Sequence, residues 1–357
     1  MWIIGCDYHP RFQHIAFVNT EGGECGNRRL EHVAEAEQFY RALSGQPVRV
    51  GMEAGGHGRW FERLLAELGQ ELWIGDPRKI RAAETRKQKS DARDAAHLLE
   101  LLLNGQFEKK MRIWVPTPGE RDVRQLVLHR HRLVGMRTQV KNQLRAVALN
   151  EGQLGSKPGL WSKQGQAQFR ARVLPPWSER RRADNLELLA ELVRRTEPLD
   201  QAVLAEAEQR PEAVRLMTHP GIGPITALTF VLTIGDPLRF ATSRKLTSYL
   251  GVIPAEDSSG GRQRLGHITK QGNALLRGLL VEAAHSAARR EPELGRCYRR
   301  LAMRKNPSIA AVRWRANWRY GCGGCGSANS RINSSALPVR MQGTLVKPLG
   351  CRSSSTL

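Results

Sequence analysis

The sequence lacks any apolar run that approaches the roughly 18 residues typical of a membrane span. Its N-terminal apolar stretch is short and is not preceded by basic residues, which argues against a signal peptide. Cysteines are few: six occur in 357 residues, and Cys6, Cys25 and Cys297 are scattered without an evident disulfide framework. These absences predict a cytoplasmic protein in a reducing environment, with no membrane partner.

The C-terminal segment lacks periodicity. Beyond about residue 313, Gly, Ser, Cys and Arg dominate, so we expect 313–357 to be a disordered tail. Cys322 and Cys325 form a Cys-x-x-Cys within it, but a structural zinc ion needs four ligands and no second pair lies nearby in the sequence. We therefore do not expect zinc there.

Acidic residues are in deficit, because 34 Asp and Glu stand against 56 Lys and Arg, which leaves a formal net charge of +22. This surplus predicts a polyanionic partner, most simply nucleic acid, with an anionic membrane surface as the competing interpretation. One dense group of cations precedes a predicted helix and is expected to contact a phosphate backbone. It comprises Arg78, Lys79, Arg81, Arg86, Lys87 and Lys89.

In so basic a chain, four carboxylates stand out by their positions. Asp7 and Glu53 each follow an apolar run and so end predicted strands, while Asp91 and Asp94 open a predicted helix. Their spacing places the last two on one helical face. Divalent cations such as Mg²⁺ prefer oxygen ligands, and phosphoryl transfer needs such cations to neutralise developing charge. The pattern therefore predicts a metal-dependent nuclease site.

A simpler explanation covers only half of this set. Ser90 is a favourable N-cap residue, and acidic residues in a first helical turn complement the helix dipole. That would account for Asp91 and Asp94, but not for two acidic residues at strand ends.

The order of predicted elements suggests three structured regions. Residues 1–108 read as three strands, helix, strand, helix, strand, helix, which is the order of an RNase H-like (RuvC-like) α/β sheet. Residues 109–210 read as a basic helical region with a coiled-coil seam of Leu126, Leu133, Val140 and Val147. This seam could pair with 186–193 or with another subunit, and 155–165 and Pro175-Pro176 read as linker or loop.

Residues 211–312 read as a mainly helical C-terminal unit. The turn 219–224 resembles a helix-hairpin-helix, whose glycines let the backbone approach phosphates, although a simple packing turn explains it equally well. A loop over 251–266 then precedes a helix at 272–288. Ser258 and Ser259 lie in this loop, where Ser and Gly are common for conformational reasons alone.

Several motifs, taken in order, resemble one family. They are Ile4-Gly5-Cys6-Asp7, Gly51-Met52-Glu53-Ala54, Lys89-Ser90-Asp91-Ala92-Arg93-Asp94-Ala95, Pro220-Gly221-Ile222-Gly223-Pro224, Gly251-Val252-Ile253-Pro254, Ser258-Ser259-Gly260-Gly261 and Lys270-Gln271-Gly272-Asn273. Together they resemble the DEDD-type transposases of bacterial insertion sequences, over roughly residues 1–312. This group includes the bridge-RNA-guided recombinases and is related to Piv-type DNA invertases.

The resemblance implies separate roles for the carboxylates, the serines and the later cations. Asp7, Glu53, Asp91 and Asp94 would be the quartet that holds Mg²⁺, and Ser259, with Ser258 as the fallback, would attack a DNA phosphate. Arg262, Arg264 and Lys270 would contact the strand. The implied partners are target and donor DNA, a noncoding guide RNA, and further copies of the chain in a dimer or tetramer.

Two other functions remain open from the residues alone. A hydrolytic nuclease, such as a junction resolvase, would use the quartet without the serine. A nucleic-acid-binding protein would use neither for catalysis. A serine hydroxyl needs activation by a base or metal, and His267 is the nearest histidine after Ser259, eight residues on. A metal cluster is therefore the expected activator.

Overall fold

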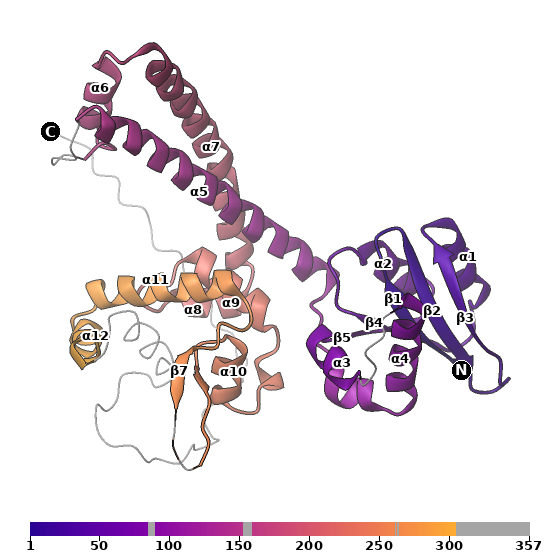
Figure 1. Cartoon of the computed structure of the whole chain (residues 1–357). Helices are drawn as coiled ribbons and strands as arrows, with labels where there is room; N and C mark the ends of the chain where they lie inside the picture. Colours follow the sequence, from indigo (N-terminus) through magenta and orange to yellow (C-terminus); the bar gives the residue numbers. More distant parts are fainter. Residues whose placement is uncertain (85–89, 153–158, 261, 263, 305–357) are drawn as a thin grey trace, which may run out of the picture. The chain divides into compact units, whose positions relative to one another are not determined.

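A computed structural model of the chain describes residues 1–84, 90–152, 159–260, 262 and 264–304 (Figure 1). Two compact units emerge: one combines Met1–Thr218 with Gly223–Arg239, and the other combines His219–Ile222 with the chain from Phe240 onwards. The predictions for Arg86, Lys87 and Lys89, for Cys322 and Cys325, and for the tail at 313–357 lie outside the described residues.

The first unit opens with a five-stranded sheet. Its strands are β1 (Trp2–Tyr8), β2 (Phe12–Asn19), β3 (Cys25–Glu31), β4 (Val48–Glu53) and β5 (Glu71–Gly75). Their order across the sheet is β3-β2-β1-β4-β5. The pairs β1–β2 and β2–β3 are antiparallel, whereas β1–β4 and β4–β5 are parallel. A mixed α/β N-terminal sheet followed by a helical remainder is thus confirmed.

Side chains alternate along β1, so the two faces of this strand contribute to two different hydrophobic clusters. Ile4 and Cys6 are buried in a cluster with Tyr40 of α1 (Ala34–Ala42) and Phe61 of α2 (Arg59–Glu67). Ile3 instead packs with a second cluster formed by α3 (Pro77–Ala83), α4 (Asp91–Leu103) and the π-helical turn η1 (Phe107–Met111). Helix α4 begins at Asp91, where the sequence predicts a helix to open.

Gly5 lets α4 approach β1 very closely. A Cβ built at Gly5 would lie 2.3 Å from the carbonyl oxygen of Ala95 and 2.4 Å from the backbone nitrogen of Leu99. Because both contacts are to backbone atoms, any side chain here would push the helix away from the strand. The glycine therefore sets how near the first turn of α4 comes to the end of β1.

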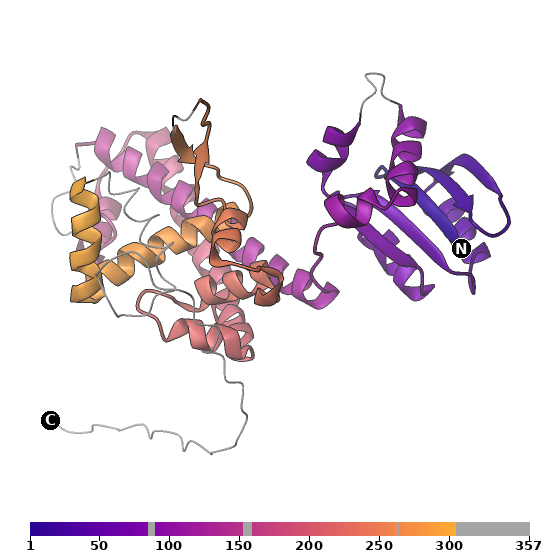
Figure 2. The ribbon, with the colours of Figure 1, turned by 90° about the horizontal axis from the view of Figure 1, so that it is seen from below.

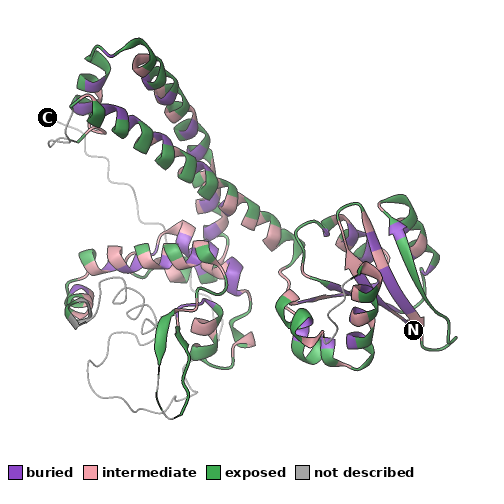
Figure 3. Cartoon of the chain, viewed as in Figure 1, coloured by how far each residue is buried: buried purple, intermediate pink, exposed green. Residues whose placement is uncertain are grey.

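The middle of the chain contains two long helices, α5 (Pro118–Asn150) and α7 (Pro176–Glu208), with α6 (Lys163–Ala171) between them. Thr117 and Glu120 form a capping box at the start of α5. The predicted seam is buried at Leu133, Val140 and Val147 and packs against α7 through Leu192. The seam therefore pairs within the chain, and Figure 3 shows buried positions recurring along both helices.

Two linker predictions in this region were wrong in part. Part of the segment predicted as loop, 163–165, belongs to α6. Pro175 and Pro176 are the N-cap and first residue of α7, where a missing N–H is tolerated and the fixed φ of proline suits a helix start.

The later elements are mostly helical. They are α8 (Pro211–Met217), α9 (Pro224–Ile234) and the 3₁₀ turn η2 (Pro237–Arg239) in the first unit, and α10 (Ser243–Tyr249), β6 (Pro254–Glu256), β7 (Leu265–Ile268), α11 (Ala274–Arg290) and α12 (Pro292–Arg304) in the second (Figure 2). Along the described residues, none of the helices has both the length and the apolar character that crossing a bilayer requires.

The turn between α8 and α9 has a packing explanation. Gly221 has φ +84°, and a Cβ there would lie 2.4 Å from the carbonyl oxygen of Ala283 and 2.7 Å from the backbone nitrogen of Ala287 in α11. The glycine is therefore required by close packing, the simpler of the two interpretations that the sequence allowed.

Candidate metal centre and serine turn

Asp7 and Glu53 lie at the same edge of the sheet. The parallel register of β1 and β4 pairs Cys6 with Met52, and Asp7 and Glu53 are the next residues on each strand. Both share the face that α4 covers, because side chains alternate along a strand and Gly51 on that face lies against Leu102. The strand ends therefore bring two of the predicted carboxylates to neighbouring positions.

The first turn of α4 adds Asp91 and Asp94 to the same place. Both carboxylates act on Asp7, since their negative charges help to raise its pKa. Ser90 occupies the N-cap position, but within the described residues its side chain makes no capping hydrogen bond. The helix dipole still favours acidic residues in this first turn, but it does not account for their position beside Asp7.

A histidine that the sequence analysis did not single out completes this cluster. His9 Nε2 lies 3.1 Å from Asp7 Oδ2 and 3.7 Å from Asp91 Oδ1. Ligand atoms of Asp7, His9 and Asp91 all lie within 4.8 Å of one another. The one available signal was the Asp-x-His spacing at the end of a strand, which alone does not show that α4 approaches both residues.

The electrostatics of this cluster favour a bound cation. Burial raises the pKa of Asp7, the neighbouring His9 lowers it, and Asp94 and Asp91 raise it further, with a raised pKa as the result. Burial and like charge thus disfavour an ionised Asp7 by itself. Glu53 is exposed at the end of β4 and, among the described residues, lies outside the group of three with ligand spacing.

The predicted serines lie in the second unit, on a hairpin rather than in a plain loop. Strands β6 and β7 pair within the segment predicted as a loop, and Ser259 forms an isolated bridge with Arg262. The Ser258 hydroxyl donates to Glu256 Oε1 at 2.8 Å and accepts from the Arg264 backbone nitrogen at 3.1 Å. Ser259 is exposed, and its carbonyl oxygen accepts from the Arg262 backbone nitrogen at 3.1 Å. The Ser258 hydroxyl is thus held within the turn.

The described members of the predicted nucleic-acid-binding set are exposed. On α3, Arg78, Lys79 and Arg81 surround the buried Ile80, so the helix presents its cations on the side away from the core. Lys79 Nζ also donates to the carbonyl oxygen of Lys110 at 2.9 Å. In the second unit the exposed cations are Arg262, Arg264 and Lys270.

Two protein-family models match the chain, and both describe transposases. A model named for the DEDD transposases of IS110 and described as "Transposase" matches residues 4–151, and one described as "Transposase IS116/IS110/IS902 family" matches residues 213–299. The first match spans all four predicted carboxylates, and the second spans both serines.

Similar proteins carry related names. A protein of Pseudomonas aeruginosa named "Probable family 20 transposase" is 29% identical, over 80% of this chain and 84% of its own. A Coxiella burnetii transposase for insertion sequence element IS1111A is 28% identical, over 80% and 78%. A Yersinia enterocolitica transposase for IS1328 is 26% identical, over 79% and 82%.

Proposed function

Because this chain belongs to the DEDD-type insertion-sequence transposases of the IS110 family, we propose that it cleaves and exchanges DNA strands with a divalent cation and a serine nucleophile. DNA is the partner that the family implies. The observation that carries the proposal is the convergence of Asp7, Asp91 and Asp94, from separate elements, at one end of the sheet. The sheet order β3-β2-β1-β4-β5 supports an RNase H-like fold for this region.

The donor set fits Mg²⁺. Carboxylate oxygens are its preferred protein ligands, and a cation would relieve the burial and the like-charge repulsion that raise the pKa of Asp7. We propose that Asp7, Glu53, Asp91 and Asp94 hold it. When bound, the cation neutralises charge on the phosphate and helps to activate a hydroxyl nucleophile.

Ser259 is the proposed nucleophile. Its Oγ would attack a DNA phosphorus, so that a phosphoserine ester forms, the bond from phosphorus to a sugar oxygen breaks, and that oxygen leaves with a proton. The exposed position of Ser259 supports this, as does the engagement of Ser258 within the turn. Arg262, Arg264 and Lys270 would contact the strand through its phosphates.

Trapping of a covalent adduct tests this proposal. Wild-type protein should form a protein–DNA adduct on a substrate designed to stall in mid-reaction. Ser259→Ala should lose both adduct and strand exchange yet still bind DNA, whereas Ser258→Ala should keep part of the activity. Asp7→Ala, Glu53→Ala and Asp94→Ala should each abolish strand exchange without unfolding the chain.

The outcomes separate the alternatives. An adduct that survives both serine changes would discard the serine mechanism, and Mg²⁺-dependent cleavage without any adduct would favour a hydrolytic nuclease. Absence of cleavage altogether would favour a binding protein. Near-wild-type activity in two of the three acidic variants would reject the quartet.

Further features rest on the family resemblance. We propose a noncoding guide RNA as a second nucleic-acid partner, and a dimer or tetramer in which the region 1–108 carries the quartet, 109–210 the helical hairpin and 211–312 the serine. The guide RNA is tested by asking whether RNA copurifies with the protein and whether unrelated competitor RNA fails to displace it. Mixing Asp7→Ala with Ser259→Ala protein tests the second, because restored activity requires sites shared between chains.

A further inference from the structure

We propose that His9 is a nitrogen ligand of the divalent cation, which makes this centre a mixed nitrogen and oxygen site that favours Mn²⁺ over Mg²⁺. This inference rests on the proposed metal site. It adds to the four carboxylates a residue that lies between two of them in the structure.

The distances suit shared coordination. When ligands lie about 2.1 Å from an octahedral ion, neighbouring ligand atoms are separated by roughly 3 Å. His9 Nε2 is 3.1 Å from Asp7 Oδ2 and 3.7 Å from Asp91 Oδ1, so small adjustments would place all three around one ion. Two of these residues come from the β1 end of the sheet and the third from α4.

The imidazole is also held in position before any ion binds. The His9 backbone nitrogen donates to the Phe12 carbonyl oxygen at 2.9 Å, which closes the turn between β1 and β2. Its ring stacks on the Phe12 ring with centroids 4.7 Å apart and planes inclined by 28°. The Arg29 guanidinium lies 4.2 Å from the centre of the same Phe12 ring. An oriented ring is what a metal-binding imidazole requires.

Ligand chemistry links this geometry to ion preference. Mg²⁺ binds mainly oxygen and keeps several waters, whereas imidazole nitrogen suits transition-metal ions. Mn²⁺ accepts both carboxylate and imidazole, so it gains more from His9 than Mg²⁺ does. The competing role for His9 is a hydrogen bond to Asp7 with no contact to the ion.

Pulsed electron paramagnetic resonance on the full-length protein with Mn²⁺ tests the proposal directly. A coordinated imidazole gives ¹⁴N modulation of the Mn²⁺ signal, which we expect in the wild type and not in His9→Ala. His14→Ala is the matched control, because His14 pairs with Asp7 across β1 and β2 and so shares its face of the sheet. It should retain the modulation.

Binding titrations add a second readout. His9→Ala should weaken Mn²⁺ binding about tenfold while changing Mg²⁺ binding less. His9→Gln can still donate a hydrogen bond to Asp7 but offers no imidazole nitrogen, so it should also weaken Mn²⁺ binding. Wild-type Mn²⁺ affinity in His9→Gln would show that His9 acts only through its hydrogen bond and would overturn the proposal.

Asp7→Asn separates failure of this inference from failure of the metal centre. If Mn²⁺ binding is lost in Asp7→Asn but the ¹⁴N modulation is absent from the wild type or survives in His9→Ala, the centre stands and the His9 ligand is rejected. If the wild type binds no Mn²⁺, or Asp7→Asn binds it normally, the metal centre itself is rejected and the His9 ligand with it.

Discussion

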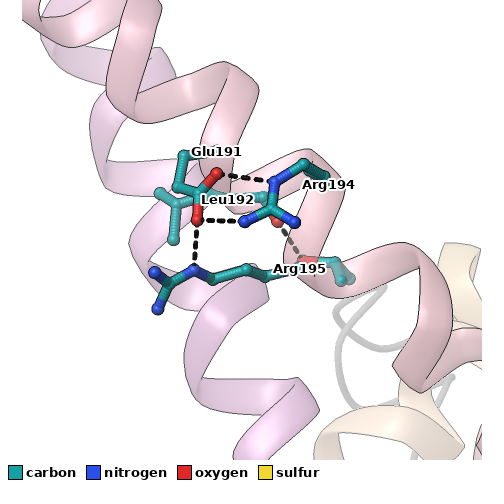
Figure 4. A network of polar contacts seen from close by, with 5 residues as sticks. Glu191, Leu192, Arg194 and Arg195 are labelled. Atoms are coloured by element: carbon teal, nitrogen blue, oxygen red, sulfur yellow. Dashed lines mark hydrogen bonds and ion pairs between the residues drawn. The ribbon is translucent and has the colours of Figure 1, made fainter.

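Asp7 on β1 and Glu191 on α7 are two acidic residues with opposite surroundings. Glu191 is flanked by two arginines of its own helix, with Arg194 Nε 2.8 Å from its Oε2 and Arg195 Nε 2.5 Å from its Oε1 (Figure 4). Hydrogen bonds from Arg194 and then Arg195 lower the pKa of Glu191 to about 2. Burial, by contrast, raises the pKa of Asp7, and Asp94 and Asp91 raise it further.

The difference shows how a chain with a net charge of +22 uses its carboxylates. Where an acidic residue has a structural role on a helix surface, arginines three and four positions later neutralise it locally. Asp7 instead has a histidine and two further aspartates as its electrostatic neighbours. A bound cation would offset the negative charge that these aspartates share, which supports the proposed metal centre alongside the geometry of Asp7, His9 and Asp91.

A substitution that moves α4 away from β1 should change the surroundings of Asp7 the most, because it removes the two aspartates beside it. Gly5→Ala places a Cβ against the backbone of α4 and should lower the free energy of unfolding by about 2–3 kcal/mol, because overpacking displaces the helix. Asp91 and Asp94 would move away from Asp7, so strand exchange should fall too. Urea unfolding and a recombination assay measure the two effects.

Gly135→Ala is the matched control for this change. Gly135 lies within α5, and a Cβ there would meet nothing within 4 Å. This variant should gain roughly 0.5–1 kcal/mol from helix propensity and keep its activity. Equal stability of the two alanine variants would contradict the close packing of α4 on β1.

Exposed cations on α3 should contribute more to nucleic-acid binding than cations that are paired with a carboxylate. Replacing Arg78, Lys79 and Arg81 by Ala should flatten the plot of log affinity against log salt by roughly 0.9 for each duplex phosphate that the variant no longer neutralises. Replacing Arg194 and Arg195, which pair with Glu191, should change that slope less. Affinity that barely responds to salt would contradict an electrostatic binding surface.

Asp7→Asn should separate stability from function. In the presence of a chelator at pH 7, the variant should unfold at a higher urea concentration than the wild type, because it removes a partly buried charge beside two other acids. Since the folded pKa of Asp7 is raised, the wild type should gain stability relative to the variant as pH falls through that pKa towards about 3.9. A variant less stable than the wild type at pH 7 would mean that the carboxylate is already compensated.

Glu191→Gln should have the smallest effect. The pKa of Glu191 is lowered, so its contribution to stability is present above the unfolded value of about 4.3 and is lost as pH falls towards about 2. Exposed ion pairs contribute little, so the urea midpoint should shift only slightly at pH 7 and still less at pH 3. A large shift at pH 7 would show that the pair holds α7 against its neighbours.

Local patterns predicted much of this structure. The apolar runs before Asp7 and Glu53, and the acidic start of α4, depend on neighbouring residues in the chain and were sufficient to place those elements. The seven-residue spacing in α5 likewise identified three of its buried residues, Leu133, Val140 and Val147, whereas Leu126 is only half-buried. By contrast, β6 and β7 are short and largely exposed, so they lack the alternation that marks a strand.

Two of the missed features share a physical cause, which is that they depend on contacts between residues distant from the local pattern. His9 joins the cluster because a tight turn follows β1 and because α4 packs on Gly5, and neither contact can be read from the residues around His9. The hydrogen bond from Ser258 to Glu256 depends on how the hairpin closes. The error at Pro175-Pro176 was different, because proline at a helix start is a local signal that was interpreted as a break.

The alternating faces of β1 also limit how proteins of this kind can diverge. A single-residue insertion between residues 2 and 7 would turn the carboxylate of Asp7 towards the α1 and α2 side of the sheet. A two-residue insertion would restore the face but displace the carboxylate by roughly 6.6 Å, out of reach of Asp91. Changes of length in a lineage should therefore accumulate in turns such as 20–24, between β2 and β3, while β1 changes only by substitution.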